Sequence, residues 1–268
     1  MRPLRRMTEL DMCARTHDDL ASKALQIVEQ ASAMGLSLRI LGGVVIRWYV
    51  TVARETYDVL RPVPNDIDLL APLKSSHAIR KTLTSLGYEP DDRLIAWRGD
   101  QRHRYCEASN GGGVYIDVFL GTPPQCHRLE LAHALATPGP ALPPTLLLLT
   151  KLQIASINEK DLIDVGFLLL ESPSALTNDG SEASISLGYL ADVLRRDWGF
   201  HHTALGNLRK LSEKLDSLFP ATFRSVVDER INALTRVIQE APKTLRWKVR
   251  SKVGTRWQWY QDVEEVVR

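Results

Sequence analysis

Three aspartates are the side chains of this chain whose types and spacing could most readily do chemistry. Asp66 and Asp68 flank Ile67 at the start of an apolar run, and Asp117 lies within a second apolar run over 114–120. If residues 66–70 form a strand, its two-residue period puts both carboxylates on one face. Two ionised carboxylates about 4 Å apart repel by about 4 kcal/mol at an effective dielectric of about 20. A divalent cation removes that repulsion, so the pattern predicts a Mg²⁺ site, because Mg²⁺ prefers oxygen ligands and bridges carboxylates to phosphates.

A pair of glycines precedes the aspartates in the chain. Residues 38–41 are apolar except for Arg39 and predict a buried strand, after which Gly42 and Gly43 allow a sharp turn into a helix beginning near Val44. A turn of this kind presents unpaired N–H groups and the positive end of the helix dipole to an anion. A phosphate-binding turn beside a metal site predicts nucleotidyl transfer, in which two metal ions contact the attacking and leaving oxygens.

These residues resemble the motifs of the DNA polymerase beta-like nucleotidyltransferase superfamily. Leu41-Gly42-Gly43, Asp66-Ile67-Asp68 and the later Asp117 fill the superfamily's pattern in order, over residues 38–170. Within the superfamily the chain looks most like the AbiEii-like toxin branch, because Lys151-Leu152-Gln153 and Lys160-Asp161-Leu162-Ile163-Asp164 resemble that branch's later motifs.

The resemblance implies a role for each matching residue. It implies two Mg²⁺ ions on the three aspartates, with Asp117 also helping to deprotonate the acceptor hydroxyl. It implies further that Lys151 steadies the triphosphate and that Asp161, and with it Asp164, supports catalysis. The alternative for Asp164 is an exposed i,i+4 pair with Lys160. The full set of expected nucleotide-binding residues is Gly42, Gly43, Arg61 and Lys151.

Two positions depart from the toxin branch. Val44 stands where those relatives usually have Thr or Ser, and Arg61-Pro62-Val63-Pro64-Asn65 replaces their Arg-x-Ser or Arg-x-Thr. Both changes leave the metal ligands intact. We therefore expect activity to be retained or altered in substrate rather than abolished.

The hydrophobic pattern predicts an α+β protein. Residues 1–144 are expected to form a nucleotidyltransferase-fold mixed sheet flanked by helices, and residues 145–268 a mostly helical domain. The Pro-rich stretch 121–144 marks the boundary. Expected helices cover 16–34, 74–86, 145–157, 161–170, 187–196, 205–218 and 222–240. Expected strands cover 93–98, 102–108 and 114–120. A basic start is expected at 1–16, and loops are expected at 54–65 and 171–186.

Two basic stretches have two interpretations each. Arg102 and Arg104 alternate with His103, which suits either a solvated edge strand or a basic wall facing a triphosphate. Residues 245–260 interleave bases with aromatic residues, a composition that can bind nucleic acid or can dock the segment onto the core.

Composition limits the class of protein. Hydrophobic residues make up 44% and charged residues 25%, as in ordinary globular domains, and the net charge of +2 means that any nucleic-acid contact needs a local basic patch. The longest apolar run is too short to cross a bilayer, so no membrane association is expected. Three cysteines without C-x-x-C spacing favour a reducing, cytoplasmic location.

The sequence therefore predicts an enzyme that moves an NMP from an NTP to an acceptor hydroxyl. The resemblance implies a tRNA or protein acceptor and a toxin of a toxin–antitoxin or phage-defence pair, with an antitoxin as partner. Two alternatives remain open: an aminoglycoside-type transferase acting on a small molecule, and a non-catalytic nucleotide- or nucleic-acid-binding protein of the same fold.

Overall fold

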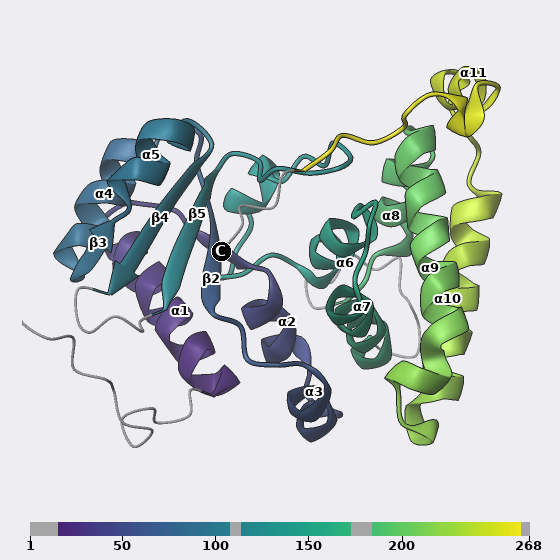
Figure 1. Ribbon diagram of the computed structural model, residues 1–268, viewed down its shortest axis with the longest axis horizontal. Helices are drawn as coiled ribbons and strands as arrows, with labels where there is room; N and C mark the ends of the chain where they lie inside the picture. The colour runs from purple at the N-terminus through teal and green to yellow at the C-terminus, as the bar shows by residue number, and fades with distance from the viewer. Residues whose placement is uncertain (1–15, 108–113, 173–183, 264–268) are drawn as a thin grey trace, which may run out of the picture.

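A five-stranded mixed sheet with helices packed around it forms the first half of the molecule (Figure 1). The computed structural model describes residues 16–107, 114–172 and 184–263. The sheet order is β1-β2-β5-β4-β3, and only β2 and β5 are parallel. This confirms the expected α+β class. The strands are β1 (Arg39–Leu41), β2 (Asp66–Ala71), β3 (Tyr88–Pro90), β4 (Arg102–Glu107) and β5 (Tyr115–Leu120).

The helix that precedes the sheet forms as its sequence predicts. In α1 (His17–Ala33), Thr16 accepts a hydrogen bond from Asp19 N and the Asp19 carboxylate accepts one from Thr16 N, which makes a capping box. Its apolar stripe is buried in the core. Two short helices follow β1, α2 (Gly43–Tyr49) and α3 (Arg54–Leu60), and α4 (Ser76–Ser85) lies between β2 and β3.

The prediction of a loop over residues 54–65 is wrong, because most of it is helix α3. The segment that leads into α3 is held by Glu171, whose carboxylate accepts hydrogen bonds from the N–H groups of Thr51, Val52 and Ala53 at 2.9–3.0 Å. Glu171 is more than a hundred residues later in the chain, so local sequence did not reveal this support.

The predicted strand 93–98 is also wrong. These residues form α5 (Asp92–Arg98), and the Asp91 carboxylate accepts hydrogen bonds from Arg93 N at 3.2 Å and Leu94 N at 3.0 Å, as an N-cap does. The strand next to β4 is β3 instead. It ends at Pro90, which suits an outer strand because proline lacks an N–H group.

The second half of the described chain is helical, as expected, and lies to the right of the sheet in Figure 1. Helix α9 begins at Trp198 rather than Leu205, because the Asp197 carboxylate accepts a hydrogen bond from Phe200 N at 2.9 Å. The helices are α6 (Pro144–Leu152), α7 (Glu159–Glu171), α8 (Leu187–Leu194), α9 (Trp198–Leu218), α10 (Ala221–Glu240) and α11 (Leu245–Ser251), with short 3-10 turns at η2 (Ala132–Leu135) and η3 (Gly254–Arg256).

The Pro-rich stretch before α6 is tied to the sheet. Ile40 N donates to Pro140 O at 2.8 Å, and Leu142 N donates to Ile40 O at 2.9 Å. Helices α6 and α7 also contact α2. The domain boundary between 144 and 145 stays a prediction.

Some expectations fall outside the part of the chain that the structure describes. They are the basic start at 1–15 and most of the loop 171–186. Within the described residues, no helix has both the length and the apolar character that spanning a membrane requires.

Candidate active site

The three aspartates meet on one face of the sheet, and we call Asp66, Asp68 and Asp117 the aspartate cluster. Asp68 on β2 lies directly opposite Asp117 on the parallel strand β5, and Asp66 is two residues earlier on the same face. Each residue offers a carboxylate oxygen, and these oxygens lie within 4.8 Å of one another. The strand register therefore brings together the carboxylates that the sequence grouped.

The glycine turn lies directly against this cluster. Gly42 has φ of 77°, a conformation that favours glycine, and a Cβ atom at this position would overlap Asp68 Oδ2. Gly43 begins α2, and a Cβ atom there would lie 3.2 Å from Arg61 Nη2 and 3.3 Å from Pro64 Cγ. The next residue, Val44, packs into the hydrophobic core. Its side chain thus has a packing role in this chain.

Two arginines of β4 hold Asp117. Arg102 donates from Nε at 3.1 Å and from Nη2 at 2.5 Å, and Arg104 donates from Nε at 2.9 Å and from Nη2 at 3.0 Å. Each carboxylate oxygen of Asp117 therefore accepts two hydrogen bonds. The interpretation of 102–108 as a solvated edge is wrong, because β4 lies between β3 and β5 and both arginine side chains are mostly buried.

Asp117 and Asp68 have opposite electrostatic environments. Burial acts to raise the pKa of Asp117, but hydrogen bonds from Arg104 and Arg102 outweigh it and hold that pKa below its ordinary value. Burial and the neighbouring carboxylates of Asp66 and Asp117 raise the pKa of Asp68 to about 7. Among the described residues, no hydrogen bond or ion pair uses the Asp68 carboxylate. Asp68 is therefore the carboxylate with the greatest need of a cation.

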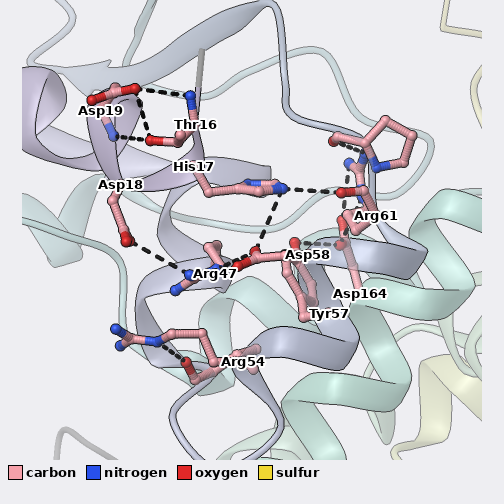
Figure 2. A network of polar contacts seen from close by, with 12 residues as sticks. Thr16, His17, Asp18, Asp19, Arg47, Arg54, Tyr57, Asp58, Arg61 and Asp164 are labelled. Atoms are coloured by element: carbon pink, nitrogen blue, oxygen red, sulfur yellow. Dashed lines mark hydrogen bonds and ion pairs between the residues drawn. The ribbon is translucent and has the colours of Figure 1, made fainter. Parts of the chain in front are cut away.

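A second polar group, here called the Asp164 network, contains Arg61, Tyr57, Lys151, Asp161 and Asp164. Figure 2 shows Tyr57 and Arg61 converging on Asp164. Asp164 Oδ1 accepts from Tyr57 Oη at 2.9 Å and from Arg61 Nε at 3.0 Å, and Asp164 Oδ2 lies 2.9 Å from Lys151 Nζ. Lys151 Nζ also donates to Asp161 Oδ1 at 2.6 Å. The network joins α3, α6 and α7.

The Asp164 network is balanced in charge. Burial acts to raise the pKa of Asp164, but Lys151 and Arg61 lower it below the ordinary value. Burial likewise acts to lower the pKa of Lys151, but Asp164 and Asp161 raise it. Because Asp164 is fully buried, the alternative of an exposed pair with Lys160 is wrong. Lys151 and Arg61, both expected to bind nucleotide, are engaged by Asp164 here, although the positive charge of Lys151 still acts on Asp68.

The residues present fit a divalent cation at the aspartate cluster. Carboxylate oxygens are the ligands that Mg²⁺ prefers, and a bound cation would offset the burial and the like charges of Asp66 and Asp117 that raise the pKa of Asp68. Asp66 and Asp68 are the best-suited ligands. Asp117 would join them only by exchanging hydrogen bonds from its arginines.

Sequence reasoning missed two features of this region. It did not include Tyr57, which is fully buried and donates its hydroxyl hydrogen to Asp164. It also left open whether Arg102 and Arg104 face the site. Their alternation with His103 was the available signal, since a pairing of β4 with β5 puts both arginines on the face of Asp117.

No family model, curated protein or solved structure matches this chain. The roles given to the site residues therefore rest on their chemistry, on their geometry and on the resemblance of the motifs.

Proposed function

We propose that this protein is a Mg²⁺-dependent nucleotidyltransferase that moves a nucleoside monophosphate from an NTP to an acceptor hydroxyl and releases pyrophosphate. One observation carries the proposal. Three carboxylates meet on two adjacent parallel strands, against a glycine turn that opens a helix, and the Asp68 carboxylate makes no hydrogen bond or ion pair within the described residues. The nucleotidyltransferase fold is part of the same proposal.

The residues divide into those that bind and those that position. Asp66 and Asp68, with Asp117, would hold two Mg²⁺ ions, which supply charge neutralisation at the triphosphate and at the attacking and leaving oxygens. Backbone N–H groups at Gly42 and Gly43 orient the triphosphate at the start of α2. The Asp164 network fixes Lys151 beside the cluster and keeps its charge in place.

The lowered pKa of Asp117 bears on the proton that the acceptor hydroxyl must lose. A carboxylate that accepts four hydrogen bonds from two guanidinium groups is a weak proton acceptor. We therefore assign Asp117 to binding and charge placement, in preference to the deprotonation that the resemblance implied.

A second candidate is a non-catalytic nucleotide-binding protein of the same fold. The observation that favours it is the saturation of Asp117 by Arg102 and Arg104, because the third metal ligand is then occupied by protein groups. The acceptor class, tRNA or protein, and a toxin–antitoxin or phage-defence setting with an antitoxin partner follow from the motif resemblance.

Pyrophosphate release tests the two candidates. Each of the four NTPs is incubated with Mg²⁺, with and without total tRNA, and the wild type is compared with the Asp66→Asn/Asp68→Asn variant. Asp92→Asn/Asp100→Asn is the matched control, because it removes two exposed carboxylates from the surface at α5. We expect release that needs Asp66 and Asp68 and survives in the control. Undiminished release by the Asp66/Asp68 variant would refute the assignment, and nucleotide binding without any release would favour the second candidate.

A further inference from the structure

A cavity of about 430 Å³ is lined by three segments that are separate in the sequence. None of its lining residues belongs to the aspartate cluster. They are the loop after β5, the first turn of α9, and the C-terminal segment from α11 to Gln261. In Figure 1 this last segment runs back from α11, past the end of α9, toward the sheet. Gln261 N donates to Cys126 O at 2.9 Å, and this hydrogen bond joins the C-terminal segment to the loop after β5.

The lining of this cavity is strongly basic. Four arginines line it, whereas Asp197 is the one acidic lining residue among those that the structure describes. Asp197 already accepts a hydrogen bond from Phe200 N as the cap of α9. Arg128 pairs with Glu130 and Arg196 pairs with Asp192, and neither carboxylate lines the cavity. Arg246 and Arg250 therefore carry the positive charge of the lining that no carboxylate pairs with among the described residues. The arginines are Arg128, Arg196, Arg246 and Arg250.

Aromatic rings make up much of the remaining wall. Trp198, Trp247, Trp259 and Tyr260 line the cavity, and the Arg250 guanidinium lies 4.8 Å from the centre of the Trp198 ring. The Trp247 Nε1 atom is buried and has no hydrogen-bond partner among the described residues. A buried N–H donor without a partner costs free energy unless a ligand accepts its hydrogen bond.

We propose that this cavity binds an unpaired segment of a single-stranded nucleic acid. Arginines neutralise phosphates, and tryptophan faces stack on bases that are free of a duplex. The cavity is of the size that holds a small organic group, which suits an unstacked nucleotide and excludes a double helix. An acidic peptide would use the arginines but not the four aromatic side chains.

The cavity and the aspartate cluster are linked along the chain by β5. The first lining segment, 126–128, follows the end of that strand, which carries Asp117. That the bound strand is the acceptor rests on the proposed function. Binding itself does not.

Fluorescence anisotropy tests the proposal with full-length protein and 5′-labelled oligonucleotides of about 10 nucleotides, a length within the usual site sizes of single-strand binders. The probes are one RNA, the same sequence as DNA, and a duplex. Arg246→Glu is the test variant, because Arg246 lines the cavity, is exposed, and makes no hydrogen bond or ion pair in the described part of the chain. Arg93→Glu is the matched control, since Arg93 is exposed on α5 and its side chain is equally without a partner there.

We expect single strands to bind more tightly than the duplex. Arg246→Glu should weaken binding about tenfold and reduce the salt dependence, whereas Arg93→Glu should change affinity by less than about twofold. Trp247→Phe keeps a ring but removes the Nε1 donor, and it should weaken binding several-fold with an unchanged circular dichroism spectrum. The RNA and DNA arms show which of the two the cavity prefers.

Three results would overturn the proposal. The first is no binding by the wild type at about 50 mM salt, where phosphate contacts are strong. The others are equal losses of affinity in Arg246→Glu and Arg93→Glu, and duplex binding as tight as single-strand binding. The Asp66→Asn/Asp68→Asn variant separates this proposal from the proposed function. It should bind the oligonucleotides as the wild type does, although it releases no pyrophosphate. A wild type that binds them but releases no pyrophosphate would refute only the catalytic proposal.

Discussion

The aspartate cluster and the Asp164 network are neighbouring groups of buried or half-buried carboxylates with different charge balance. In the network, Asp164 contacts two cations and a tyrosine hydroxyl, and its pKa lies below the ordinary value. In the cluster, Asp68 faces two other carboxylates, and its pKa rises to about 7. Carboxylates that the protein neutralises hold elements together, whereas a carboxylate whose pKa is raised by burial and by like charges is a candidate for binding a ligand.

The largest effect on stability is expected in the Asp164 network. Asp164→Asn keeps the shape of the side chain but leaves Lys151 and Arg61 mostly buried without their shared counter-charge. Breaking one partner of such a group costs about 3–5 kcal/mol. Urea unfolding monitored by tryptophan fluorescence measures the loss.

Asp161→Asn is the control for that prediction. Lys151 then retains Asp164, so the loss should be about 1.5 kcal/mol, the contribution of one hydrogen bond to a charged group. Equal losses in the two variants would contradict the central place given to Asp164.

In the aspartate cluster, replacing a carboxylate is expected to stabilise the protein rather than destabilise it. The folded pKa of Asp68 is above its unfolded value, so its contribution to stability is complete below pH 4 and is lost as the pH rises to about 7. At pH 8 without Mg²⁺, Asp68→Asn should therefore be more stable than the wild type by about 1–2 kcal/mol, less than the full shift implies because solvent reaches the side chain. His127 and His201, whose pKa values burial lowers to about 4, change stability in the other direction between pH 4 and 6.5. The difference between the two proteins cancels their contribution.

Adding Mg²⁺ gives a second test of the aspartate cluster. At about ten times its dissociation constant, Mg²⁺ should stabilise the wild type by about 1.4 kcal/mol and leave Asp68→Asn nearly unchanged. Thermal unfolding with and without Mg²⁺ provides the measurement. A wild type whose stability does not respond to Mg²⁺ would place the cluster with the structural carboxylates.

The smallest effect concerns the glycine turn. Gly42→Ala combines an unfavourable positive φ with an overlap on Asp68 Oδ2, whereas Gly35→Ala has the same kind of φ, 79°, and open space around the new Cβ atom. Gly42→Ala should therefore cost about 1 kcal/mol more than Gly35→Ala, as displacement of a packed side chain does. Chemical denaturation of the two variants gives the difference, and equal losses would mean that the turn and Asp68 are not in contact.

Periodicity and capping residues predicted much of the fold, including α1, the β2 and β5 strands and the helical second half. They failed at two helices, for different reasons. Helix α3 depends on Glu171, a distant residue at the end of α7. Helix α5 has a local cap, Asp91, but the alternating residues after it favoured a strand.

The candidate site likewise combines features that local sequence predicts with features that depend on distant segments. The aspartates were found because their spacing along one strand is visible in the sequence. The four hydrogen bonds from Arg102 and Arg104 to Asp117 depend on the pairing of β4 with β5, and the contacts of Lys151 with Asp164 depend on how α6 packs on α7. Neither set of contacts can be predicted from the spacing of residues along the sequence.

The hydrogen bond from Gln261 to Cys126 also gives the fold an order of completion during translation. Every residue of the aspartate cluster and of the Asp164 network has been synthesised by residue 164, and N-terminal parts of a chain fold first as it is made. The wall of the basic cavity, by contrast, needs residues 246–261. A nascent chain can therefore assemble its carboxylates well before the surface at the end of the chain closes over α9.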